Sequence, residues 1–104
     1  MNGRKRPQAE GHSIRITLKV FGGLRQLRPS TPEDLTVPAN CTIDDLWSKL
    51  ALGAPIFVEK LRDGIAGGYL HVLLNGRNIV FLEGAQTKLT DGDTVAVLPP
   101  VGGG

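Results

Sequence analysis

Residues 42–50 read Thr-Ile-Asp-Asp-Leu-Trp-Ser-Lys-Leu and form the clearest helical pattern in the chain. Apolar side chains recur there at helical spacing and share one stripe: Ile43, Leu46, Trp47 and Leu50. Thr42 can cap this helix, and Asp45, three residues on, completes an imperfect capping box. Gly53 and Pro55 are typical of a helix end. The pattern predicts one amphipathic helix with Trp47 in the core.

Two strand patterns precede this helix. Apolar and polar residues alternate from Ile14 to Val20, which predicts a half-buried strand ended by Phe21-Gly22-Gly23. Leu24 to Pro32 is rich in turn-forming residues and predicts a loop or a widened hairpin turn. Leu35 to Val37 is a short second strand pattern. We expect the two strands to pair as an antiparallel hairpin.

Three strand patterns follow. Tyr69 to Leu74 and Arg77 to Val80 flank Asn75-Gly76, a strong signal for a two-residue hairpin turn. After an irregular stretch, Thr94 to Leu98 predicts the last strand, which cannot continue as a paired central strand through Pro99-Pro100.

The region between the helix and these strands has weaker patterns. Pro55 to Arg62 predicts a second, shorter helical turn, since Ile56, Phe57 and Leu61 are apolar. Asp63 to Gly68 holds three glycines and is predicted to be a loop.

The element order, two strands, a helix and three strands, predicts an α+β fold with a helix on one face of a sheet. If the first and last strands lie side by side, they run parallel at the sheet centre, which is the ubiquitin-like β-grasp architecture. We expect a disordered tail at 1–12, one β-grasp domain at 13–101 and a flexible glycine tail at 102–104. The expected core is Ile14, Ile16, Leu18, Val20, Ile43, Leu46, Trp47, Leu50, Val95 and Val97.

Composition excludes several classes of function. The chain has 104 residues, with 12 Lys and Arg against 10 Asp and Glu, and residues 1–12 carry the whole basic excess. A domain without net charge is a poor candidate for nucleic-acid binding, so we expect no nucleic-acid partner. No apolar run approaches the ~20 residues of a membrane span, and no secretory signal is expected. One cysteine, Cys41, leaves no internal disulfide, and a reducing cytoplasm is the expected location.

No residue set predicts an active site. His12 lies in the tail, and His71 is interpreted as a surface position on a strand. Cys41 precedes the helix, where a thiol pKa can be lowered, but it lacks a base partner and is better interpreted as a small filler. The sequence has no His, Cys or carboxylate cluster at metal-ligand spacing. It also lacks the two glycine-rich phosphate-binding motifs, GxxxxGK(S/T) and GxGxxG, so we expect no bound metal or cofactor.

The unusual feature is the stretch after the last strand. Pro99-Pro100-Val101 leads into Gly102, Gly103 and Gly104. Glycine has no Cβ, so such an end can thread a narrow channel, and the prolines stiffen its stem. Composition alone leaves open an ordinary frayed terminus or a cloning remnant.

Residues 89–103, LTDGDTVAVLPPVGG, closely resemble the C-terminal signature of the β-grasp sulfur carriers. That family includes the molybdopterin synthase small subunit, carriers of the thiamine and cysteine pathways, and archaeal ubiquitin-like modifiers. The Asn75-Gly76-Arg77 hairpin, the Asp-Gly-Asp turn, the Pro-Pro stem and the Gly-Gly end occur in matching order. The resemblance covers Ile14 to Gly103, and Gly104 is a third glycine where the family usually ends at two.

The resemblance implies a carrier rather than an enzyme. In the family, a ubiquitin-activating-like enzyme uses ATP to adenylate the terminal glycine, here Gly104, or Gly103 if the last residue is trimmed. A persulfide sulfur donor then converts it to a thiocarboxylate, and a sulfur-accepting synthase subunit takes the sulfur. The segment expected to contact these partners is Leu98, Pro99, Pro100, Val101, Gly102 and Gly103, with the adjoining sheet face.

Three functions remain open from the sequence. Pro-Pro-Val before the glycines mildly favours delivery to a molybdenum or tungsten pterin, whereas loops around Pro29–Pro32 and Asp63–Gly68 disfavour the thiamine branch. The same terminus suits a protein modifier joined to lysines. The third alternative is a β-grasp interaction module with an inert tail.

Overall fold

The computed structural model describes residues 12–99. The predicted N-terminal tail, apart from His12, lies outside the described residues. So do Pro100, Val101 and the predicted glycine tail at 102–104.

Five strands form one sheet in the order β3-β2-β6-β4-β5. Their bounds are β2 (Ser13–Val20), β3 (Glu33–Pro38), β4 (His71–Leu74), β5 (Arg77–Asn78) and β6 (Thr94–Leu98). β2 and β3 pair antiparallel, with Ile14 opposite Val37, which confirms the predicted hairpin. β6 pairs parallel with β2, with Leu18 opposite Val95, and antiparallel with β4. The first and last strands therefore lie side by side at the sheet centre.

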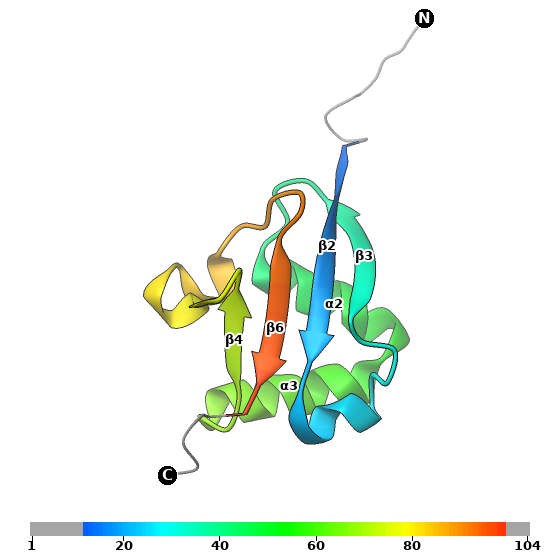
Figure 1. Ribbon diagram of the computed structural model, residues 1–104, viewed down its shortest axis with the longest axis vertical. Coiled ribbons are helices and arrows are strands. Elements are labelled where there is room, and N and C mark those ends of the chain that lie inside the picture. The colour runs from blue at the N-terminus through cyan, green and yellow to red at the C-terminus, as the bar shows by residue number, and fades with distance from the viewer. Residues whose placement is uncertain (1–11, 100–104) are drawn as a thin grey trace, which may run out of the picture.

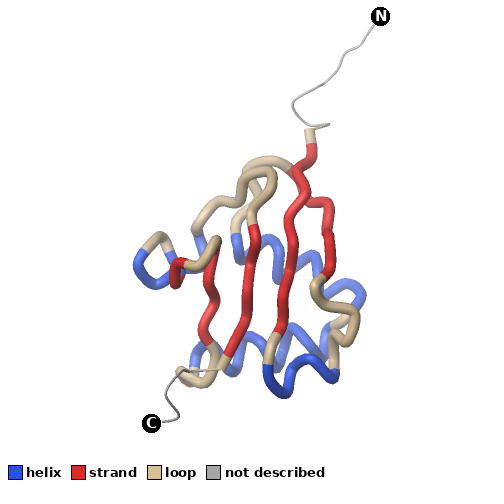
Figure 2. Tube along the Cα trace, viewed as in Figure 1, coloured by secondary structure: helices blue, strands red, loops and turns tan. Residues whose placement is uncertain are grey.

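Both α-helices cover the same face of the sheet (Figures 1 and 2). They are α2 (Ile43–Gly53) and α3 (Pro55–Ala66). Short 3₁₀ segments η1 (Gly22–Gln26), η2 (Ile79–Phe81) and η3 (Gly84–Gln86) connect the elements. The arrangement confirms the predicted α+β, ubiquitin-like β-grasp fold, but with two helices of similar length where the sequence predicted one main helix.

The start of α2 is fixed by the predicted capping box. The Asp45 N–H donates to the Thr42 hydroxyl at 3.1 Å, and the Thr42 N–H donates to the Asp45 carboxylate at 3.0 Å. Asp satisfies the box although Glu or Gln is preferred at that position. The cap sets the rotation of the helix, and all four residues of its apolar stripe are buried.

Nine of the ten predicted core residues are buried, and Ile14 is half-buried against the core. Trp47 is 2% exposed, which confirms its core position. The core also contains residues outside that prediction, because α3 and the strand edges contribute side chains: Val37, Cys41, Phe57, Val58, Leu61, Val72, Leu74, Ile79 and Leu89.

The predicted loop at Asp63–Gly68 is wrong for its first four residues, because α3 continues to Ala66. Gly64 lies inside this helix, where a glycine is ordinarily unfavourable. A Cβ at Gly64 would lie 2.4 Å from Leu70 Cδ1, so the missing side chain makes room for Leu70. The Gly64 carbonyl also accepts the N–H groups of Tyr69 and Leu70, at 2.8 and 3.0 Å. This glycine therefore serves packing, and β4 starts only at His71.

The second hairpin is shorter than predicted. Asn75 and Gly76 have φ of 52° and 87°, as a type I′ turn requires, so the predicted turn is confirmed. The return strand covers only Arg77–Asn78. The Asn78 side chain accepts the Val80 N–H at 3.0 Å and starts η2, so the chain leaves the sheet there. β5 consequently pairs only with the second half of β4, at Leu73 and Leu74.

Replacement of Trp47 by Ala should lower the free energy of unfolding by about 3–5 kcal/mol, because the indole is buried in the core. Urea denaturation measures this, and Trp47→Phe should lose less. A melting temperature close to that of the unaltered chain would contradict the burial of Trp47.

Candidate functional site

The candidate site begins where β6 ends. β6 lies between β2 and β4, so hydrogen bonds hold it on both sides up to Leu98, which pairs with His71. Pro99 follows and is exposed, and its ring nitrogen has no N–H for a ladder. The fold therefore delivers the segment after Pro99 from the middle of the sheet at one end of the molecule (Figure 1).

The start of β6 is locked by a buried carboxylate. Asp93 is 8% exposed and accepts three hydrogen bonds: from the Thr90 N–H at 2.7 Å, the Thr90 hydroxyl at 3.1 Å and the Asn75 amide at 2.9 Å. The Asn75 side-chain oxygen in turn accepts the Thr94 N–H at 2.9 Å. This network joins the turn before β6 to the turn after β4 and fixes the register of the last strand.

The end of β6 is held by the chain that leaves β2. The Phe21 N–H donates to the Val97 carbonyl at 2.9 Å. Gly22 follows with φ of 76°, and a Cβ there would lie 3.4 Å from Pro99 Cδ. The positive φ favours glycine at this sharp turn beside the proline. Phe21, Gly22, Leu98 and Pro99 together form what we call the tail root.

The sheet face away from the helices has an apolar centre next to the tail root. Side chains alternate along the strands, so Leu73, Ala96 and Leu98 lie on the face opposite the buried Val72, Val95 and Val97. These three are half-buried, and Phe21 is 47% exposed. Of the predicted contact segment, Leu98 and Pro99 lie here, whereas Pro100, Val101, Gly102, Gly103 and the acyl residue Gly104 lie outside the described residues.

This geometry, a β-grasp sheet whose central strand leads into a Pro-Pro and glycine segment, has a match among known families. The sequence profile of the ThiS family matches residues 18–104. The chain belongs to the ThiS family. The matched region includes β6, the tail root and all three final glycines.

Proteins similar to this ThiS-family chain are named as a small archaeal modifier, a sulfur carrier or a molybdopterin converting factor subunit. Small archaeal modifier protein 3 of Haloferax volcanii is 50% identical over 92 residues, which are 88% of this chain and all of the relative. A putative sulfur carrier protein of Archaeoglobus fulgidus is 34% identical over 74 residues, 68% of this chain and 84% of the relative. The solved structure of a putative molybdopterin converting factor, subunit 1, from Pyrococcus furiosus superposes with a TM-score of 0.68 at 26% identity, covering 85% of this chain and 99% of that one.

Reactive side chains do not converge in residues 12–99 of the ThiS-family chain. No group of three or more His, Cys, Asp or Glu residues in this range could hold a metal ion. Over the same range, no helix is long and apolar enough to cross a membrane. His71 is half-buried and faces Asn78, with 3.5 Å between Nδ1 and the amide nitrogen, rather than a second titratable group.

Cys41 is a core residue, as the filler interpretation predicted. It is 5% exposed and lies beside a pocket of about 310 Å³. Burial raises the pKa of the Cys41 thiol, the Asp45 carboxylate raises it further, and Lys49 partly offsets the rise. Proximity to a helix N-terminus therefore does not lower the pKa of the Cys41 thiol here.

Sequence reasoning missed two pockets near the tail root. One of about 260 Å³ is lined by Lys19, Phe21 and Arg25, and another of about 330 Å³ lies along the open edge of β4. The available signal was the consecutive apolar run Ile79-Val80-Phe81, which breaks the period-two alternation of a half-buried return strand. In the structure Val80 and Phe81 are 70% and 80% exposed.

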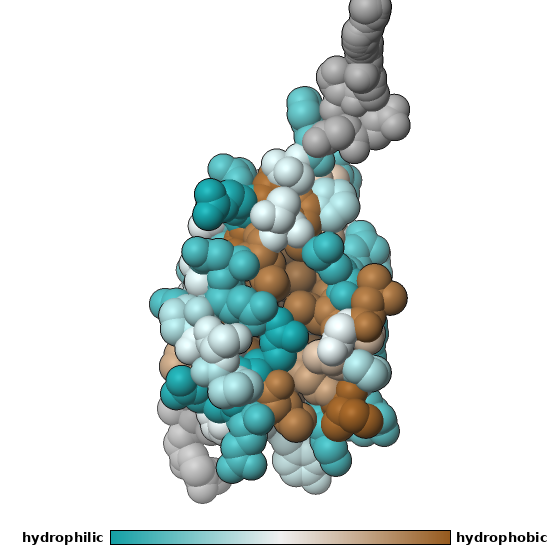
Figure 3. Space-filling model, turned by 90° about the vertical axis from the view of Figure 1, so that its right-hand side faces the viewer, coloured by the Kyte–Doolittle hydropathy of each residue, from teal (hydrophilic) through white to brown (hydrophobic). Residues whose placement is uncertain are grey.

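Apolar surface also shows on the side of the molecule that carries β3 (Figure 3). Leu52 and Ile56, on either side of the junction between α2 and α3, are 89% and 55% exposed. Neither belongs to the tail root, and we do not assign them to the site.

Replacement of Asp93 by Ala should lower the free energy of unfolding by about 1–3 kcal/mol, because buried donors on Thr90 and Asn75 lose their acceptor. Asp91→Ala is the matched control: Asp91 is exposed and accepts a hydrogen bond from the Arg15 N–H at 2.8 Å. Urea denaturation of both variants measures the difference. Equal losses for the two variants would show that the buried network does not hold β6.

Cys41 should react slowly with iodoacetamide in the folded chain at neutral pH, because its pKa is raised and the thiol stays protonated. The raised pKa also means that this group's contribution to stability is present at low pH and lost as pH rises through the folded-state pKa. Alkylation rates measured against pH, with and without urea, test both statements. A folded-state inflection below that of the urea-unfolded chain would overturn them.

Proposed function

We propose that this chain is a sulfur carrier whose C-terminal glycine is adenylated and then converted to a thiocarboxylate. The observation that carries the proposal is the emergence of a Pro-Pro and glycine segment from the central strand of a ThiS-family fold. The family match extends through residue 104, so it includes the proposed reacting residue. The chain acts as a co-substrate in this role, and the catalytic groups belong to its partners.

The proposed chemistry needs two stages because a carboxylate is a poor electrophile. The Gly104 carboxylate attacks the α-phosphate of ATP on an adenylating enzyme, which releases pyrophosphate and leaves an acyl adenylate. The terminal sulfur of a persulfide donor then attacks the acyl carbon and displaces AMP. A thiol cleaves the resulting S–S bond, which leaves the thiocarboxylate on the glycine. Gly103 takes the role of Gly104 if the last residue is removed first.

We propose a molybdenum or tungsten pterin precursor as the acceptor of the sulfur, on a synthase subunit in the cytoplasm. The Pro99-Pro100-Val101 stem supports this branch, as does the similarity to the Pyrococcus furiosus protein named as a molybdopterin converting factor subunit. Carriers of cysteine or thiamine biosynthesis are the alternatives within the same chemistry.

A second candidate function is protein modification, in which the activated glycine is joined to a lysine. The specific observation in its favour is the 50% identity to a Haloferax volcanii protein named as a small archaeal modifier. Both functions use the same adenylated glycine, and they differ in the nucleophile that follows. Mass spectrometry of the chain from its source cells separates them: a terminal –COSH supports the carrier, and isopeptide-linked conjugates support the modifier.

Replacement of Gly103 by Val should abolish adenylation while leaving the free energy of unfolding unchanged. A β-branched residue restricts the backbone and widens the chain where the acyl carbon must come within about 3–3.5 Å of its attacking atom. ATP–pyrophosphate exchange with the adenylating enzyme of the source cells measures this. Appending a bulky residue after Gly104 should have the same effect.

Removal of Gly104 alone is the informative control. If the full chain and the chain without Gly104 are both adenylated, either glycine can serve as the acyl end. If only the shorter chain is adenylated, Gly104 is removed first. If neither length is charged by any candidate adenylating enzyme from the same cells, the carrier proposal is wrong and the inert interaction module replaces it.

A further inference from the structure

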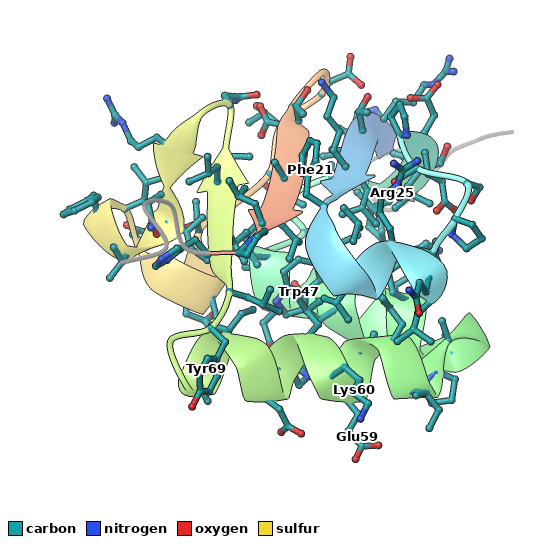
Figure 4. The ribbon with its side chains drawn as sticks, turned by 60° about the horizontal axis from the view of Figure 1, so that its bottom comes forward. Phe21, Arg25, Trp47, Glu59, Lys60 and Tyr69 are labelled. Atoms are coloured by element: carbon teal, nitrogen blue, oxygen red, sulfur yellow. The ribbon has the colours of Figure 1, made fainter. Side chains whose placement is uncertain are left out.

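Two pockets of unlike chemistry flank the strand that carries the tail. β2 and β4 are the two neighbours of β6, and each leads to one pocket at the end of the sheet where Pro99 emerges. In Figure 4, which shows this end of the molecule, Phe21 and Arg25 lie on one side of the end of β6 and Tyr69 lies on the other.

The pocket on the β2 side is cationic. Lys19, Phe21, Arg25 and Thr31 help to line its ~260 Å³, and no acidic side chain does. Neither Lys19 nor Arg25 forms an ion pair within residues 12–99. Glu33, one residue beyond Pro32, is already paired with Arg28, so it does not neutralise the pocket. We call this site the cationic pocket.

The pocket on the β4 side is apolar. It has a volume of about 330 Å³ and lies between the end of α3, β4 and the η2–η3 segment. Trp47, Ile65, Leu70 and Val80 help to line it, and β5 pairs only with Leu73 and Leu74, so no strand covers the first half of β4. We call this site the apolar cleft.

Both sites are within one strand of the tail root. The Phe21 N–H bonds to the Val97 carbonyl, and His71, which lines the apolar cleft, pairs with Leu98. Neighbouring strands lie about 4.8 Å apart, so a protein that binds the segment after Leu98 lies close to both sites and can contact them together. The cationic pocket favours an acidic side chain and the apolar cleft favours an apolar one. Only one orientation of a partner places both side chains correctly.

We propose that the protein that receives the tail docks on both flanks, with an acidic side chain between Lys19 and Arg25 and an apolar side chain in the cleft beside Val80. Charge complementarity steers the encounter and selects the orientation, while burial in the cleft holds the complex. This inference rests on the proposed function for the identity of the partner, an adenylating enzyme. It adds the chemistry of the surface by which that enzyme recognises the chain.

The chain's own C-terminal segment is a poor occupant of the cleft. Val101 is the one large apolar side chain after Pro100, and three glycines follow it. Ordering glycine costs more conformational entropy than ordering any other residue, and one valine does not offset that cost. A folded partner presents its side chain without this cost, which favours an external occupant.

The test compares steady-state ATP–pyrophosphate exchange for charge-reversed and control chains with the adenylating enzyme of the source cells. Lys19→Glu with Arg25→Glu should raise the KM for the chain about tenfold with little change in kcat, and more strongly at low ionic strength. The matched control is Lys49→Glu with Lys88→Glu. It changes the net charge equally but alters exposed residues that line neither flanking pocket.

The apolar flank has its own pair of variants. Val80→Asp should raise the same KM about tenfold, since it places a charge where a partner side chain is buried. Leu52→Asp is the control, because Leu52 is 89% exposed and lies at the end of α2. Thermal unfolding of all four variants shows whether each remains folded, which we expect because every altered side chain is exposed.

The outcomes separate this proposal from the proposed function. If the unaltered chain is not charged, the proposed function fails, and NMR titration of the ¹⁵N-labelled chain with the same enzyme then tests the docking surface directly. If the unaltered chain is adenylated and each flank variant has the same KM as its control, the two-sided docking is wrong. An effect confined to one flank overturns it too, because the orientation argument requires both.

Discussion

The parallel pairing of β2 with β6 is the interaction on which the rest of the structure depends. It closes a chain whose two halves are otherwise separate hairpins, and it places the last strand between the first strand and β4. Both faces of β6 are then defined: Val95 and Val97 enter the core, while Ala96 and Leu98 join the opposite face. Because the chain continues directly from this strand, the pairing also fixes where the segment after Pro99 leaves the sheet.

The features that could be predicted from the sequence are those that neighbouring residues decide. The stripe that ends in Leu50, the Thr42–Asp45 capping box and the Asn75-Gly76 turn each depend on spacings of a few residues, and the structure confirms all three. The unusual composition of the Pro-Pro and glycine segment was also visible in the sequence, and the match to the ThiS family includes that segment.

The features that sequence reasoning missed depend on residues far apart in the chain. Gly64 resembles a loop signal, yet it lies within α3 because Leu70 needs the space of its absent Cβ. The cationic pocket joins Lys19 to Arg25 and Thr31 through the turn after β2, and the apolar cleft brings Trp47 near Val80. Such sites have no periodicity along the sequence, so they emerge only when the sheet order is known.

The central position of β6 has a mechanical consequence. A pull on the segment after Pro99 acts along a strand that is bonded to β2 on one side and β4 on the other. The bonds to β2, which runs in the same direction, share the load as a group instead of opening one at a time. Forced unfolding is governed by the barrier to breaking such a group rather than by equilibrium stability. The segment after Pro99 can therefore be pulled while the domain behind it remains folded.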